Sequence, residues 1–129
     1  MIICAIIPSA IIFITLIARW SYLNQPRAFA YAFQAKTKDV RLDHSYRFYM
    51  KKVNRQYRCY IERTPSFRNR DTSRYIPHYY IENGTGRIFI CWTGKIHFRS
   101  QARTLCRNWA NATQQFIDTG IPAPGFGRR

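Results

Sequence analysis

Residues 87–120 read RIFICWTGKIHFRSQARTLCRNWANATQQFIDTG and decide the fold. The stretch opens with a nearly continuous apolar run, which is typical of a buried β-strand. After a short turn, Ser100 is placed to cap a helix that the spacing predicts as far as about Asp118, and Gly120 ends it. At about 100° per residue, one helix face is apolar. Its residues are Ala102, Leu105, Cys106, Trp109, Ala112, Phe116 and Ile117.

Further strands precede this segment. Alternating apolar and polar side chains predict strands over residues 46–51 and 57–62. Ile76–Glu82 is rich in Tyr and Ile, and a Gly-containing turn joins it to the apolar run as a hairpin. The sequence therefore predicts an α+β fold. We expect a small antiparallel sheet of three or four strands packed by one C-terminal amphipathic helix and preceded by an N-terminal hydrophobic helix.

The chain begins with an apolar run, MIICAIIPSAIIFITLIA, in which no residue is charged. A bilayer-spanning helix needs about 20 apolar residues, so residues 1–23 predict a transmembrane segment. Trp20 and Tyr22 fit its interfacial end. Basic residues flank the run only on its C-terminal side, which predicts a single-pass protein with its C-terminal domain in the cytoplasm. Two alternatives are a cleaved signal peptide and a translation start at Met50, which would leave a small soluble cytoplasmic domain.

Composition and charge divide the rest of the chain. Lys and Arg number 21 against 6 Asp and Glu, a net charge of +15, and hydrophobic residues make up 47%. Such a hydrophobic fraction argues against general disorder. Most of the positive charge follows residue 45, so we predict a linker over 24–45, a basic ββββα domain over 46–120 and a flexible basic tail over 121–129. The linker also allows a short helix after Pro26.

Arginines interleave with aromatic residues in the predicted strands. Alternation places Arg58 and Tyr60 on an open sheet face, where Arg binds phosphate and Tyr stacks on bases. Arg99, Arg103 and Arg107 follow at i, i+4 and i+8, so they form a second basic row on the helix, beside Gln114. The alternative interpretation is that the Tyr rings cover a small core while the Arg side chains solvate the outer faces.

Motifs of catalysis and metal binding are not found in the sequence. It contains no GxSxG, HExxH, phosphate-binding loop or GxGxxG pattern. The Cys and His spacings match no common zinc site, and the cysteines form no CxxC pair. We therefore predict a protein that is not an enzyme, with no catalytic residue, metal or cofactor, and with reduced thiols.

The apolar strand and the helix within Arg87–Ala112, separated by Gly94, resemble the three-stranded-sheet-plus-helix DNA-binding domains of the integrase-arm and AP2 type. In that family the sheet enters the major groove, and its Arg and aromatic side chains contact DNA. The resemblance implies three DNA contacts in this chain. They are Arg58, Tyr60 and Arg87.

These features predict non-enzymatic, weak and non-specific binding of nucleic acid by a domain that residues 1–18 attach to a membrane. The alternative is a single-pass membrane protein whose basic cytoplasmic domain binds anionic lipid or a protein partner. The predicted binding residues are Arg58, Tyr60, Arg87, Arg99, Arg103 and Arg107.

Overall fold

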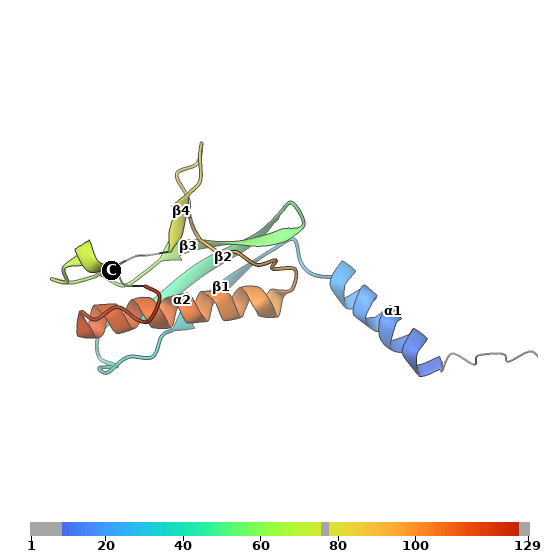
Figure 1. Cartoon of the computed structure of the whole chain (residues 1–129), viewed down its shortest axis with the longest axis horizontal. Coiled ribbons are helices and arrows are strands. Elements are labelled where there is room, and N and C mark those ends of the chain that lie inside the picture. The colour runs from blue at the N-terminus through green and yellow to red at the C-terminus, as the bar shows by residue number, and fades with distance from the viewer. Residues whose placement is uncertain (1–8, 76–77, 127–129) are drawn as a thin grey trace, which may run out of the picture.

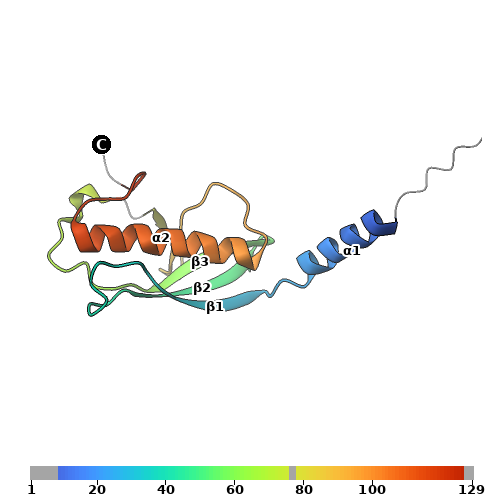
Figure 2. The ribbon, with the colours of Figure 1, turned by 90° about the horizontal axis from the view of Figure 1, so that it is seen from below.

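The computed structural model describes residues 9–75 and 78–126. Its elements are α1 (Ser9–Leu23), β1 (Ala28–Gln34), β2 (Ser45–Val53), β3 (Gln56–Arg63), the 3-10 helix η1 (Thr72–Arg74), β4 (Tyr79–Ile81), β5 (Ile88–Ile90) and α2 (Arg99–Thr119). The strands form one antiparallel sheet in the order β1-β2-β3-β5-β4. Helix α2 lies along one face of the sheet, and α1 projects from one end of it (Figures 1 and 2). The predicted α+β fold is confirmed.

Strand β1 occupies part of the predicted linker, so the expected short helix after Pro26 is wrong. The strand pairs with β2 from Ala28↔Lys51 to Gln34↔Ser45. Its aromatic residues recur with a period of two and pack against the helix-covered core, while the intervening alanines point to the open face. Alanine favours helices by propensity, but burial of the aromatic rings on one sheet face decides the conformation here.

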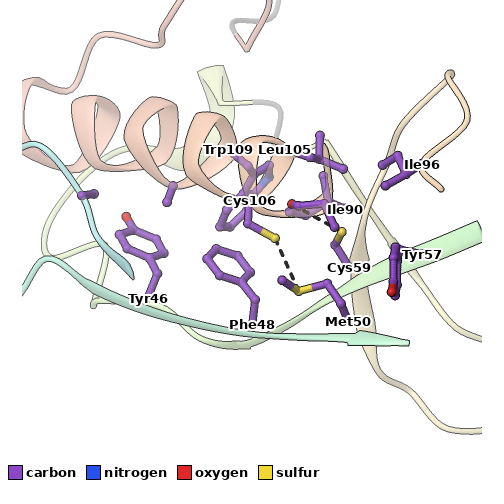
Figure 3. Packing of buried hydrophobic residues seen from close by; sticks show 13 residues of the cluster. Tyr46, Phe48, Met50, Tyr57, Cys59, Ile90, Ile96, Leu105, Cys106 and Trp109 are labelled. Carbon is purple, nitrogen blue, oxygen red and sulfur yellow. Dashed lines mark hydrogen bonds between the residues drawn. The ribbon is translucent and has the colours of Figure 1, made fainter. Parts of the chain in front are cut away.

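The core lies between α2 and the sheet (Figure 3). All seven residues of the predicted apolar helix face are buried, which confirms both the helix and its phase. From the sheet, buried side chains of β2, β3 and β5 meet this face. They are Tyr46, Phe48, Met50, Tyr57, Cys59 and Ile90. The Trp109 ring packs edge-on against Tyr46 and Phe48, with its centroid 6.2 Å from each.

Helix α2 starts one residue before Ser100, the predicted cap. Phe98 is the N-cap residue, and the Gln101 side chain replaces a capping hydroxyl: its Oε1 accepts hydrogen bonds from the backbone N–H groups of His97 and Phe98. At the other end, Gly120 has the left-handed φ of 72° that ends a helix, as predicted.

Two buried polar residues of α2 are not part of any predicted core. Gln114 and Thr113 are fully buried, although the sequence places Gln114 beside the arginine row. Gln114 Oε1 accepts from the Tyr46 hydroxyl at 2.9 Å, and its Nε2 donates to Asp118 at 3.0 Å. Tyr75 shares a 2.6 Å hydrogen bond with Thr113, and burial raises the pKa of Tyr75 to about 12. The buried amide and hydroxyls are therefore satisfied by one another.

Two short turns join neighbouring antiparallel strands. The Asn54–Arg55 turn between β2 and β3 has positive φ at both residues, 53° and 65°, as a type I′ turn requires. The predicted hairpin over 76–92 is confirmed as β4 and β5, with shorter strands than expected. Residues 76–77 lie outside the described residues.

The two ends of the chain are described in part. Within residues 9–75 and 78–126, no helix combines the length and the apolar character needed to cross a bilayer, and residues 1–8 of the predicted transmembrane segment lie outside the described range. In the predicted flexible tail, Phe126 stacks on Tyr75 and contacts the His78 ring, so this position packs against the domain.

Candidate functional site

Three of the predicted binding residues meet on the open face of the sheet. Arg58 Nη1 donates to Glu82 Oε2 at 2.8 Å, and the Tyr60 hydroxyl donates to the same oxygen at 2.5 Å. The Arg87 guanidinium lies over the Tyr60 ring, with Cζ 4.1 Å from the ring centroid. The structure thus brings Arg58, Tyr60 and Arg87 together beside the carboxylate of Glu82.

Glu82 is the electrostatic centre of this open-face cluster. Its second oxygen accepts from the Thr85 hydroxyl at 2.8 Å. Hydrogen bonds from Tyr60, Thr85 and Arg58 lower the pKa of Glu82 from 4.5 to about 2. Burial and the bond to Glu82 raise the pKa of Tyr60. At neutral pH the cluster therefore holds an ionised carboxylate, a neutral phenol and paired guanidinium groups.

The expected exposure of Tyr60 is wrong, because its side chain is 3% exposed. Arg87 covers its ring, and Phe89 packs against it with centroids 6.1 Å apart. Base stacking on Tyr60 would need Arg87 to move, and a phosphate at Arg58 would compete with Glu82. In the described part of the sheet, Tyr60↔Phe89 is the only register pair between β3 and β5, and the side-chain contacts of the cluster also attach the β4–β5 hairpin to β3.

The three predicted helix residues lie on the other layer of the molecule. The Arg99 guanidinium lies over the Phe29 ring at 5.2 Å, and that of Arg103 lies over Phe29 at 5.8 Å and Tyr31 at 5.7 Å. Arg107 is exposed and donates to Thr104 one turn before it. This arginine row borders β1, so the structure does not bring it together with the open-face cluster.

A second group of cations assembles where α1 joins the domain. The Arg27 carbonyl accepts from the Lys52 N–H at 2.8 Å, and the Arg55 carbonyl accepts from His97 Nδ1 at 3.2 Å. The Arg99 N–H donates to Gln25 Oε1 at 2.9 Å. These bonds collect cations from three separate segments at one end of the sheet. We call this group the cationic end; its residues are Arg27, Lys51, Lys52, Arg55 and Arg99.

The ion pairs of the described residues do not include the cationic end. Five of the six carboxylates of the chain pair with arginines elsewhere. The pairs are Asp39–Arg41, Asp43–Arg63, Glu62–Arg87, Glu82–Arg58 and Asp118–Arg68. The sixth, Asp71, caps η1. Among the described residues, no carboxylate forms an ion pair with a cationic-end residue, so this end keeps a positive charge. The sequence alone does not reveal this group, because only the strand register places Arg27 beside Lys52.

Helix α1 exposes apolar side chains directly beside the cationic end. Eight large apolar residues are 50–68% exposed. They are Ile11, Ile12, Phe13, Ile14, Leu16, Ile17, Trp20 and Leu23. The helix is attached at its C-terminal end, where the Tyr22 ring contacts those of His97 and Phe98 at 5.7 and 5.8 Å. Exposed apolar area of this extent is typical of a membrane or protein contact.

Two small clefts flank the loop between β5 and α2. One of about 270 Å³ opens where β5 leaves β3 and is lined partly by Cys59, Phe89 and Trp92. The other, of about 310 Å³, shares Trp92 and lies against α2. Neither lining includes a carboxylate or an imidazole, and the described residues contain no group of three or more potential metal ligands.

Comparison of the chain with protein-family models, with curated proteins and with solved structures yields no match.

Proposed function

We propose that the protein is a non-enzymatic module that binds an anionic membrane surface, with α1 inserted among the lipids and the cationic end against the headgroups. The observation that carries this proposal is the juxtaposition of the exposed apolar helix and a group of cations that form no ion pair with a described carboxylate. An apolar helix next to a basic surface provides the two contributions that stable membrane attachment requires.

Helix α1 and the cationic end contribute to membrane binding in different ways. Most exposed side chains of α1 are large and apolar, and its one charged residue, Arg19, lies near the domain end, so insertion removes much apolar surface from water. Trp20 and Tyr22 lie at the domain end of α1, where amphipathic rings suit the headgroup level. Each Lys or Arg held near an anionic surface contributes about 1 kcal/mol at physiological salt. The cationic end therefore adds several kcal/mol of preference for anionic over zwitterionic lipid.

Vesicle flotation of the full chain tests this proposal. We expect partitioning into phosphatidylserine-containing vesicles to exceed partitioning into pure phosphatidylcholine vesicles, and the difference to shrink as salt is added. A variant with Lys52, Arg55 and Arg99 replaced by Gln should lose about a hundredfold of binding to the anionic vesicles. Ile14→Asp, in α1, should weaken binding to both vesicle types.

A matched variant separates location from total charge. Replacing Lys36, Lys38 and Arg47 by Gln removes the same number of charges from exposed positions outside the cationic end. This variant should bind anionic vesicles within about threefold of the wild-type chain, because headgroup attraction falls off within a Debye length. Equal losses for the two triple variants would reject the cationic end as the contact.

Nucleic acid is the second candidate, because its phosphates offer the cationic end the same chemistry as lipid headgroups. The absence of carboxylate pairing among these described residues favours any phosphate polyanion. If nucleic acid is the ligand, an oligonucleotide should bind the full chain with an affinity that falls steeply between about 50 and 200 mM salt. Ile14→Asp should leave that affinity unchanged, whereas it should weaken the vesicle complex.

A further inference from the structure

We propose that the free edge of β1 is a docking site for an extended acidic peptide, which adds a sixth strand to the sheet and places its carboxylates on the arginine row of α2. This partner is a protein segment, and its site shares Arg99 with the membrane contact proposed above, while β1, Arg103 and Arg107 lie outside that contact. Three features of the molecule support this site: the backbone of β1, the spacing of the arginines and their charge.

The hydrogen-bond register shows which backbone groups of β1 are free. Ala35 N–H donates to the His44 carbonyl, and Lys52 N–H donates to the Arg27 carbonyl, so the odd-numbered residues of β1 pair with β2. The N–H and C=O groups of Ala28, Ala30, Ala32 and Gln34 therefore point away from β2. Strand β1 is the first in the sheet order, so within the described residues these groups face an unpaired edge.

The side chains of β1 leave this edge accessible. Its seven residues, AFAYAFQ, include no charge and no proline, which are the usual devices that block pairing at an edge strand. The register of β1 on β2 is continuous over the whole strand, without a bulge. On the open face, Ala30 and Ala32 are exposed and small, so they offer no steric obstacle to another strand.

The arginine row runs alongside the same edge. Helix α2 is attached to both ends of β1: Arg99 N–H bonds to Gln25 Oε1, and Asn111 Oδ1 accepts from Lys36 N–H, each at 2.9 Å. Arg103 and Arg107 lie between these two attachments. Successive members of the row rise by about 6 Å along the helix. Alternate side chains of a strand are about 6.6 Å apart, so carboxylates at every second position match the row.

The reach of the arginines fits an added strand. The guanidinium groups of Arg99 and Arg103 lie 5.2–5.8 Å from the Phe29 and Tyr31 ring centroids, on the helix-covered face of the sheet. A sixth strand would lie about 4.8 Å beyond β1. The helix-side carboxylates of that strand would therefore lie beside guanidinium groups that already extend over β1.

The positive charge of the arginine row favours an acidic occupant. No carboxylate in the described residues forms an ion pair with Arg99, Arg103 or Arg107. Arg103 Nε is buried and has no hydrogen-bond partner among the described residues. Arg103 as a whole is half-buried, so a partner carboxylate that reaches its guanidinium would form a charge-assisted hydrogen bond that no described carboxylate supplies.

A second copy of the chain is a poorer occupant. Two β1 edges paired antiparallel about a twofold axis would bring the two arginine rows to the same side of the joined sheet. Arg27 at one end of β1 would also approach Lys36 of the other copy. Like charges opposed across a sheet are destabilising, whereas an acidic segment reverses each of these contacts.

The test uses the full chain in zwitterionic nanodiscs and fluorescence anisotropy of labelled peptides. We expect a peptide of alternating glutamate and threonine to bind about tenfold more tightly than a peptide of the same composition with all its glutamates in one block. Methylation of the alternate amides that face β1 should abolish binding, because it removes the backbone donors of the added strand.

Protein variants locate the site. Ala32→Pro removes an outward N–H that the fold does not use, so it should weaken the alternating peptide about tenfold without lowering the unfolding midpoint. Arg103→Gln should weaken the peptide about fivefold, whereas Lys95→Gln, which removes an exposed charge from the β5–α2 loop, should change its affinity less than twofold.

Several results would overturn the proposal. These are equal affinities for the alternating and block peptides, for the methylated and unmethylated peptides, or for Ala32→Pro and the wild-type chain. Equal losses for Arg103→Gln and Lys95→Gln would reduce the contact to net charge. If the chain self-associates and Ala32→Pro abolishes the self-association, the β1 edge binds a second copy. If an oligonucleotide displaces the peptide and binds Ala32→Pro as tightly as the wild-type chain, the arginine row binds nucleic acid.

Discussion

Replacing Trp109 by alanine tests the packing of α2 on the sheet. The indole is 4% exposed, and its ring packs edge-on against Tyr46 and Phe48. Truncation removes about 200 Å² of buried aromatic surface. At about 25 cal/mol per Å² this area corresponds to about 5 kcal/mol, an upper value because the unfolded chain buries part of it. Large aromatic-to-alanine changes cost about 3–5 kcal/mol. We expect Trp109→Ala to lower the free energy of unfolding by about 4 kcal/mol.

Urea denaturation of the full chain in mild detergent, followed by far-ultraviolet circular dichroism, measures this change without relying on the removed fluorophore. Gln115→Ala is the matched control, because Gln115 is exposed on the same helix. It should change the free energy of unfolding by less than about 0.5 kcal/mol. A cost for Trp109→Ala within about 1 kcal/mol of the Gln115→Ala value would refute the helix–sheet packing described above.

The remaining predictions concern single contacts. Gln101→Ala should cost about 1 kcal/mol in the same assay, because it uncaps two N–H groups at the start of α2, and a cost near zero would contradict that role. Since folding lowers the pKa of Glu82 from 4.5 to about 2, its stabilisation is complete above pH 4.5 and disappears as the pH falls toward 2. Glu82→Gln should therefore reduce the acid sensitivity of the unfolding midpoint, and an unchanged pH profile would contradict the cluster. Arg55→Gly should raise stability by about 1 kcal/mol by removing a side chain from a left-handed position, yet weaken binding to anionic vesicles. A stabilised variant with unchanged vesicle binding would remove Arg55 from the contact.

Patterns of short range predicted the elements that depend on neighbours in the chain. The apolar face of α2 follows from residues spaced within one or two helical turns, and Gly120 ends the helix directly after it. Each hairpin is closed by the turn residues between its two strands. Strand β1 was not predicted, because its alanines favour a helix and its pairing partner β2 is separated from it by a loop. Gln114 was assigned to the polar surface for a related reason: its buried partner, Tyr46, belongs to a strand remote in sequence.

The candidate sites divide in the same way. Composition determines the positive excess, the apolar N-terminal run and the row of arginines along α2, because each depends only on residue type and local spacing. The tertiary structure decides which cations can bind a ligand, because ion pairs such as Arg58–Glu82 join segments that are distant in sequence. The same packing buries Tyr60 and gathers the cationic end from three segments. Periodicity encodes the direction of a side chain within its own element, whereas pairing and exposure depend on the register and packing between elements.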